Sequence, residues 1–293
     1  MTAPVFAHGG LYDLAAASLG HWSREPITIA LLLASATLYV AGVRALWRRA
    51  GTGQGIRRWE VASFAAGTAS MAIALLSPLA WLSEALFSAH MTQHEVLMLV
   101  SAPLVVFGRP ALACLWALAP SAREAVGRWT RRTTVAASWH ALTGPTAAFA
   151  FHALALWIWH VPALYGAALE SEAIHGLQHF SFFATAALFW WGMIHGRYGR
   201  LGFGAAVLYV FLTALHSSIL GALLTVAPSV WYPAYVPRAA AWQLDALADQ
   251  QLAGLLMWVP SGLVFIAFGL ALLAAWLGES ERRARLGSVH SHS

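Results

Sequence analysis

The sequence predicts an all-α membrane protein, a polytopic bundle of about seven transmembrane helices. First, 59% of its 293 residues are hydrophobic and 10% are charged, whereas about a quarter of the residues of a typical soluble protein are charged. Second, apolar stretches of roughly 20 residues, the length that crosses about 30 Å of hydrocarbon, recur along the chain. Third, arginines gather in alternate loops between these stretches, which is typical of a chain that crosses a membrane repeatedly.

Seven stretches are long enough to span a membrane, and each is too uniformly apolar for a surface helix. In chain order they are Ile27 to Trp47, Glu60 to Trp81, His90 to Phe107, Thr143 to His160, Ala173 to Ile194, Phe203 to Val226 and Asp249 to Leu277. The first exceeds the apolar part of a secretory signal, so we expect it to remain as an anchor. The shorter stretch Ala111 to Ala119 fits either an interfacial helix or an extension of the third span bent at Pro110.

All seventeen basic residues are arginines, and cytoplasmic loops collect such residues. They follow the first, third, fifth and seventh stretches, while Arg24 and Arg238 fall in the other compartment. This alternation predicts an outer N-terminus and a cytoplasmic C-terminus. We expect one transmembrane domain over residues 1–278, beginning with an outer segment 1–25, and a disordered cytoplasmic tail over residues 279–293. Because short loops beside the membrane hold the arginines, the pI near 9.9 does not indicate binding to nucleic acid.

Histidine pairs open two of the predicted spans. The third begins His90-Met91-Thr92-Gln93-His94 and the fifth contains His175-Gly176-Leu177-Gln178-His179. Residues four apart share a helix face, so each pair can present two imidazoles to one ion. The alternative is that the histidines are interfacial residues that reach water or contact neighbouring helices.

Further polar residues enter the same outer layer. His160 ends the fourth span, Asp249 opens the seventh, and Met257 lies two turns below Asp249. Ionisable groups at such depths are costly and normally point into the bundle. We therefore predict a shared metal site near the outer membrane face, with the candidate ligands His90, His94, His160, His175, His179, Met257 and Asp249.

Copper is the metal that this set favours. Imidazole suits zinc, copper, iron and nickel, and thioether ligands shift the preference to Cu(I). The sole cysteine is Cys114, so a Cys-x-x-Cys motif and an intrachain disulfide are excluded. Zinc remains an option, as does haem held by two histidines.

The same motifs carry a family resemblance. The run His90 to His94, then Ala102-Pro103-Leu104 and Gly108-Arg109-Pro110, resembles the polytopic CtaG-type cytochrome c oxidase assembly family. So do the runs Trp159 to Tyr165, His175 to His179 and Asp249 to Gly254. The resemblance covers roughly Glu84 to Gly262, and Ala253 stands where the family pattern has a glycine. The single-span copper chaperone of similar name is unrelated.

The resemblance implies a multi-pass protein of the bacterial inner membrane that assists assembly of a haem-copper cytochrome c oxidase and is not an enzyme. Its expected partners are the lipid bilayer and, in the outer compartment, oxidase subunits or a copper donor. Two alternatives remain from other classes. One is a zinc-dependent membrane hydrolase similar to alkaline ceramidases, with Asp249 or Glu95 as acid/base. The other is a haem-binding electron carrier or a transporter.

Overall fold

The computed structural model describes residues 22, 23, 25–195 and 198–290, although the side chains of residues 195–203 and 281–290 lie outside the description. Within these residues every regular element is helical. The first half contains α2 (Pro26–Ala50), α3 (Arg58–Leu76), α4 (Pro78–Ala85), α5 (Phe87–Glu95), the π-helix η1 (Val96–Ser101), α6 (Ala102–Phe107), α7 (Pro110–Ala117), α8 (Pro120–Thr130) and α9 (Thr133–Leu142). The second half contains α10 (Pro145–Trp159), α11 (Pro162–Glu170), α12 (Glu172–His195), α13 (Tyr198–Thr225), α14 (Tyr235–Ala240) and α15 (Ala246–His290).

Proline sets many of the helix starts. Six helices have proline as their first residue, where its missing N–H would have no partner and its fixed φ suits the helix. These residues are Pro26, Pro78, Pro110, Pro120, Pro145 and Pro162. Pro78 divides the second predicted stretch into α3 and α4, and Pro145 separates α10 from α9. Each of the seven predicted stretches is mainly helical, but prolines cut several of them shorter than the sequence suggested.

The helices that qualify as candidate membrane spans do not clearly number seven. Four helical segments are long and apolar enough to cross a membrane in the described residues: α2, α3, Gly204–Thr225 of α13 and Ala246–Ser280 of α15. Two further spans result if Phe87–Phe107 with α7, and α9 with α10, each count as one, although both pairs bend by 52°. The estimate is therefore four to six rather than seven. Helix α12 has 24 residues but does not qualify, since His175, Gln178 and His179 reduce its apolar character.

The short apolar stretch from Ala111 to Ala119 follows a bend in the chain and lies mostly in helix α7. Arg109 adopts a left-handed conformation with φ of 54°, and the Tyr39 hydroxyl donates to the Gly108 carbonyl over 2.7 Å. Helix α7 then packs on α2, where Gly42 allows close approach to the backbone of Ala113. Most of the stretch thus forms a separate helix that packs against α2 through its buried residue Ala113.

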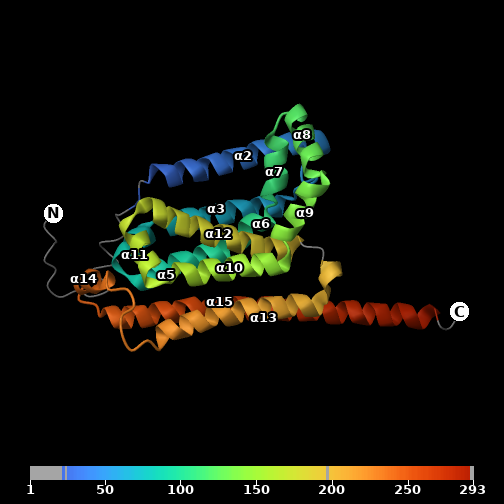
Figure 1. Ribbon diagram of the computed structural model, residues 1–293. Coiled ribbons are helices and arrows are strands. Elements are labelled where there is room, and N and C mark those ends of the chain that lie inside the picture. Colours follow the sequence, from blue (N-terminus) through green and yellow to red (C-terminus); the bar gives the residue numbers. More distant parts are fainter. Residues whose placement is uncertain (1–21, 24, 196–197, 291–293) are drawn as a thin grey trace.

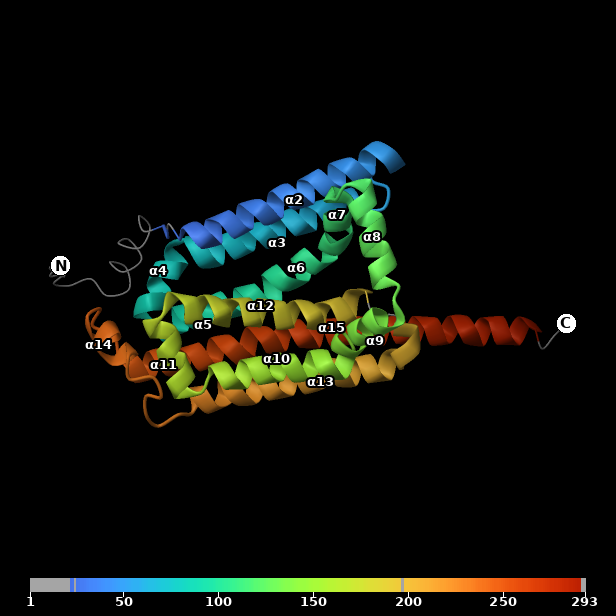
Figure 2. The same cartoon turned by 45° about the horizontal axis from the view of Figure 1, so that its top comes forward.

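The main core lies among α5, α10, α12, α13 and α15, whereas α2 and α3 pack with α7 around a second core. Helices α2 and α3 lie on one side, α13 and α15 lie side by side on the other, and α5, α10 and α12 run between them (Figures 1 and 2). Helices α8 and α9 occupy one end of the bundle, and α11 and α14 occupy the opposite end (Figure 1). The arginine-rich segment and the histidine-bearing helix starts are therefore separated along the bundle. This arrangement agrees with the predicted alternation.

The two terminal predictions have different outcomes. The predicted outer segment 1–25 lies almost wholly outside the described residues. Helix α15 continues to His290, through most of the segment 279–293 that we expected to be disordered, and residues 291–293 lie outside the description. The helix extends well beyond the rest of the bundle (Figure 1).

Candidate metal centre

Helix α5 is fixed in place by a contact from α15. Leu86 precedes α5 and provides no side-chain cap. Asp249 of α15 supplies the acceptor instead, because its carboxylate accepts from Phe87 N over 2.7 Å, from Ser88 N over 3.3 Å and from the Ser88 hydroxyl. An acidic side chain at a helix N-terminus both satisfies free N–H groups and complements the helix dipole. The face of α5 that carries His90 and His94 is thereby fixed relative to α15.

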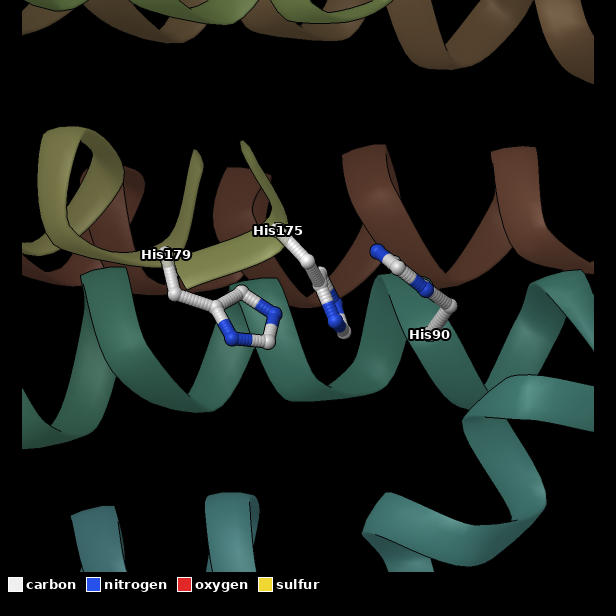
Figure 3. Close-up of side chains that lie close together, drawn as sticks. All are labelled: His90, His175 and His179. Carbon is white, nitrogen blue, oxygen red and sulfur yellow. The ribbon is translucent and has the colours of Figure 1, made fainter. Parts of the chain in front are cut away.

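Three histidines from two helices converge beside this contact. One ligand atom each of His90, His175 and His179 lies within 4.8 Å of the others. The His175 ring centroid is 5.1 Å from that of His90 and 4.2 Å from that of His179, so His175 lies between them (Figure 3). The two helix starts, α5 and α12, therefore contribute their histidines to one cluster, as their spacing predicted.

His94 joins the same cluster one turn below His90. Its ring centroid is 4.5 Å from that of His90 and 5.2 Å from that of His179. His90 and His94 are both 1% exposed, so water does not reach them directly. We call His90, His94, His175 and His179 the histidine cluster.

A tyrosine sets the protonation pattern of His90. The Tyr235 hydroxyl donates to the Ser83 carbonyl over 3.1 Å and lies 3.3 Å from His90 Nδ1. A phenol has one hydrogen, so the Tyr235 oxygen accepts from the His90 Nδ1–H. Burial raises the pKa of the Tyr235 hydroxyl, which keeps the phenol neutral. The His90 Nε2 lone pair is then free to bind a metal, an arrangement that metal-ligating histidines commonly show.

His160 has the same pattern at the edge of the cluster. Its Nδ1 donates to the Leu156 carbonyl over 2.7 Å, while Nε2 lies 3.4 Å from the sulfur of Met91. Phe182 stands between His160 and His94, with ring centroids 6.2 Å and 4.6 Å away respectively. His160 and Met91 therefore form an N/S pair adjacent to the cluster. Met91 was not among the predicted ligands.

The other two predicted ligands occupy different places. The carboxylate of Asp249 is engaged by the N-terminus of α5, as described above, and contacts none of the imidazoles by hydrogen bond within the described residues. Met257 is 3% exposed and lines a deeper cavity together with Glu95 and His152. The structure thus brings four of the predicted histidines into one cluster, places His160 beside it, and assigns Asp249 and Met257 to neighbouring features.

The histidine cluster contains nitrogen atoms that are available to bind a metal ion. Five enclosed imidazole nitrogens have no hydrogen-bond partner in the described part of the chain: Nε2 of His90, His175 and His179, and both nitrogens of His94. A buried polar atom without a partner costs about 1–3 kcal/mol, so a concentration of five calls for an explanation such as a bound ion. Several neutral imidazoles beside one thioether form a donor set suited to copper or zinc, with copper favoured by the sulfur.

Comparisons with known proteins give a family for this chain. A family model described as cytochrome c oxidase caa3 assembly factor (Caa3_CtaG) matches residues 37–279. Uncharacterized proteins of Mycobacterium bovis, Mycobacterium tuberculosis and Mycobacterium leprae are each 26% identical to it over 268 residues, which cover 87% of this chain and 39% of the relative. The chain therefore spans about two fifths of the length of these relatives. No solved structure matches it.

Proposed function

The chain belongs to the family of cytochrome c oxidase caa3 assembly factors, and from this premise we propose that it binds copper in the histidine cluster for assembly of a haem-copper oxidase. The observation that carries the proposal is the set of enclosed imidazole nitrogens without partners, contributed by α5 and α12 together. A family of assembly factors also favours a non-enzymatic role over that of a zinc-dependent hydrolase.

The ligands that we assign are His90, His94, His175 and His179, with His160 and Met91 beside them. His90 and His179 would bind through Nε2, since these atoms are enclosed and unpartnered. Tyr235 holds the His90 ring from the opposite side, and Asp249 holds the helix that carries it. The protein would hold these side chains in position, and the copper ion bound by them would be handed to the oxidase.

The arginine pattern supports a proposal for the membrane location of the protein and of its histidine cluster. We propose a multi-pass protein of a bacterial inner membrane, with the histidine cluster near the outer face. The cluster lies at the end of the bundle that holds α11 and α14, opposite the arginine-bearing α8 (Figure 1). A copper donor or an oxidase subunit in the outer compartment would reach this end.

A double-substitution experiment tests whether the cluster is one copper site. The full chain is purified in detergent with His94→Ala, His179→Ala, both changes, or His140→Ala, an exposed histidine of α9, as the control. Copper per chain is measured by mass spectrometry, and oxidase activity is measured in membranes. Residues that act as a unit have non-additive effects. We expect each cluster variant to lose bound copper and oxidase activity, the double variant to be little worse, and the control to be unchanged.

Three outcomes would count against this proposal. Losses that simply add would indicate independent sites. Normal copper content in both single variants would indicate that the histidines serve in helix packing and do not bind copper. Zinc at one equivalent per chain, or a haem absorption band in the purified protein, would favour the corresponding alternative.

A further inference from the structure

A second polar feature lies deeper in the bundle. A small cavity of about 20 Å³ is lined by residues of α5, η1, α10, α13 and α15. Its polar and sulfur-containing wall residues are Glu95, Met98, His152, Ser217, Met257 and Ser261. A volume of this size holds one occupant no larger than a water molecule. We call it the Glu95 cavity.

Glu95 brings a carboxyl group to this cavity. Its Oε2 is enclosed and has no hydrogen-bond partner among the described residues. The described wall contains no arginine, and the whole sequence contains no lysine. An acidic group inside a membrane bundle is costly and normally has a partner of opposite charge. The described wall offers none here, so its unpartnered carboxyl oxygen is a candidate ligand for a cation.

The remaining wall residues indicate what kind of cation fits. Met98 and Met257 are thioethers, which select soft ions, and His152 adds an imidazole. The Ser217 and Ser261 hydroxyls donate to the carbonyls of Thr213 and Met257, so their oxygens remain free as acceptors. One carboxylate balances one positive charge, and a neutral pair is far less costly to bury than a divalent ion with a single carboxylate.

The cavity adjoins the histidine cluster through two helices. Glu95 follows His94 directly in α5, and the π-helix η1 begins at the next residue. Leu156, whose carbonyl accepts from His160 Nδ1, is also part of the cavity wall. Single π-helical turns within helices occur frequently at functional sites, because they change the direction of side chains on one face. Met98 of η1 lies in the wall that contains Glu95.

We propose that the Glu95 cavity is a second site for a soft monovalent cation, Cu(I) or its analogue Ag(I), held by Glu95, His152, Met98 and Met257. This inference rests on the proposed function, since it makes the histidine cluster the first of two neighbouring sites. The protein would then hold two ions per chain.

Silver binding tests the inference without any reaction of the oxidase. The full chain in detergent is loaded with Ag(I), desalted and analysed for silver per chain. We expect two equivalents in the wild type, one in Glu95→Gln and one in Met257→Leu. His179→Ala should keep the equivalent in the cavity. Met193→Leu, a buried methionine outside the wall, is the matched control and should keep two.

Further measurements distinguish a loss of silver binding from a failure of the variant to fold. Thermal unfolding of each variant identifies any that fails to fold, and Met98→Leu then replaces it as the wall variant. One silver per wild-type chain, lost in His179→Ala but kept in Glu95→Gln, would overturn the second site and leave the proposed function standing. Two equivalents that survive in both Glu95→Gln and Met257→Leu would also overturn it. No silver in the wild type would overturn the second site, whereas copper per chain in the His94 and His179 variants would still decide the proposed function.

Discussion

Replacing Asp249 with alanine tests whether this residue fixes α5 rather than binding metal. The carboxylate accepts from the backbone N–H groups of Phe87 and Ser88, which are 1% and 8% exposed. Each buried donor left without a partner costs about 1–3 kcal/mol, so the two together cost about 2–6 kcal/mol of unfolding free energy.

Asp245 offers a matched control on the same helix. It caps α15 locally, accepting from Leu247 N over 3.4 Å and Ala248 N over 3.0 Å at an exposed position. Loss of such a cap costs about 0.5–2 kcal/mol. Asp249→Ala should therefore be clearly less stable than Asp245→Ala when both are unfolded thermally or with a denaturing detergent.

Metal binding distinguishes the positioning role from a ligand role. Because Asp249 acts through α5, we expect Asp249→Ala to weaken copper affinity without changing the number of ions bound at saturation. Equal stability of Asp249→Ala and Asp245→Ala would refute the argument from α5. A well-folded Asp249→Ala protein that no longer binds copper at saturation would restore Asp249 as the ligand that the sequence suggested.

Three further predictions follow from particular contacts. Tyr235→Phe removes the acceptor that orients an imidazole of the cluster, and loss of such a partner lowers metal affinity about 10–100-fold, measurable by competition with a chelator. Gly254→Ala places a methyl group 2.6 Å from backbone atoms of α13 and should lower the unfolding temperature, whereas Gly262→Ala meets nothing within 4 Å and should not. In a cysteine-free background, a membrane-impermeant thiol reagent should label a cysteine placed at Glu170 but not one at Arg128, and the reverse pattern would invert the topology.

Much of the architecture follows from local sequence. Apolar length predicts the helices, because every backbone polar group in hydrocarbon must be satisfied within its own segment. The family resemblance and the convergence of His90, His94, His175 and His179 were also predictable. The i,i+4 spacing places each pair on one face, and their common position at helix starts places both pairs at one depth. The copper assignment itself stays a prediction.

Other features depended on how the helices meet. The sequence predicted seven uniform spans, yet the bends at Arg109 and before Pro145 and the polar start of α12 reduce the candidates to four to six. Asp249 and Met257 lie on one face of α15, and the sequence placed this face beside the histidines. The rotation and depth of α15 in the bundle decide what each side chain contacts.

The sequence by itself therefore determined which residues share a helix face, because that depends on the fixed period of the α-helix. The tertiary structure decided which faces meet. The hydrogen bonds that the Asp249 carboxylate accepts from the start of α5, the Tyr235 contact with His90, and the Glu95 cavity all join residues more than fifty positions apart. Their geometry is set by packing between helices, for which the period of a single helix contains no information.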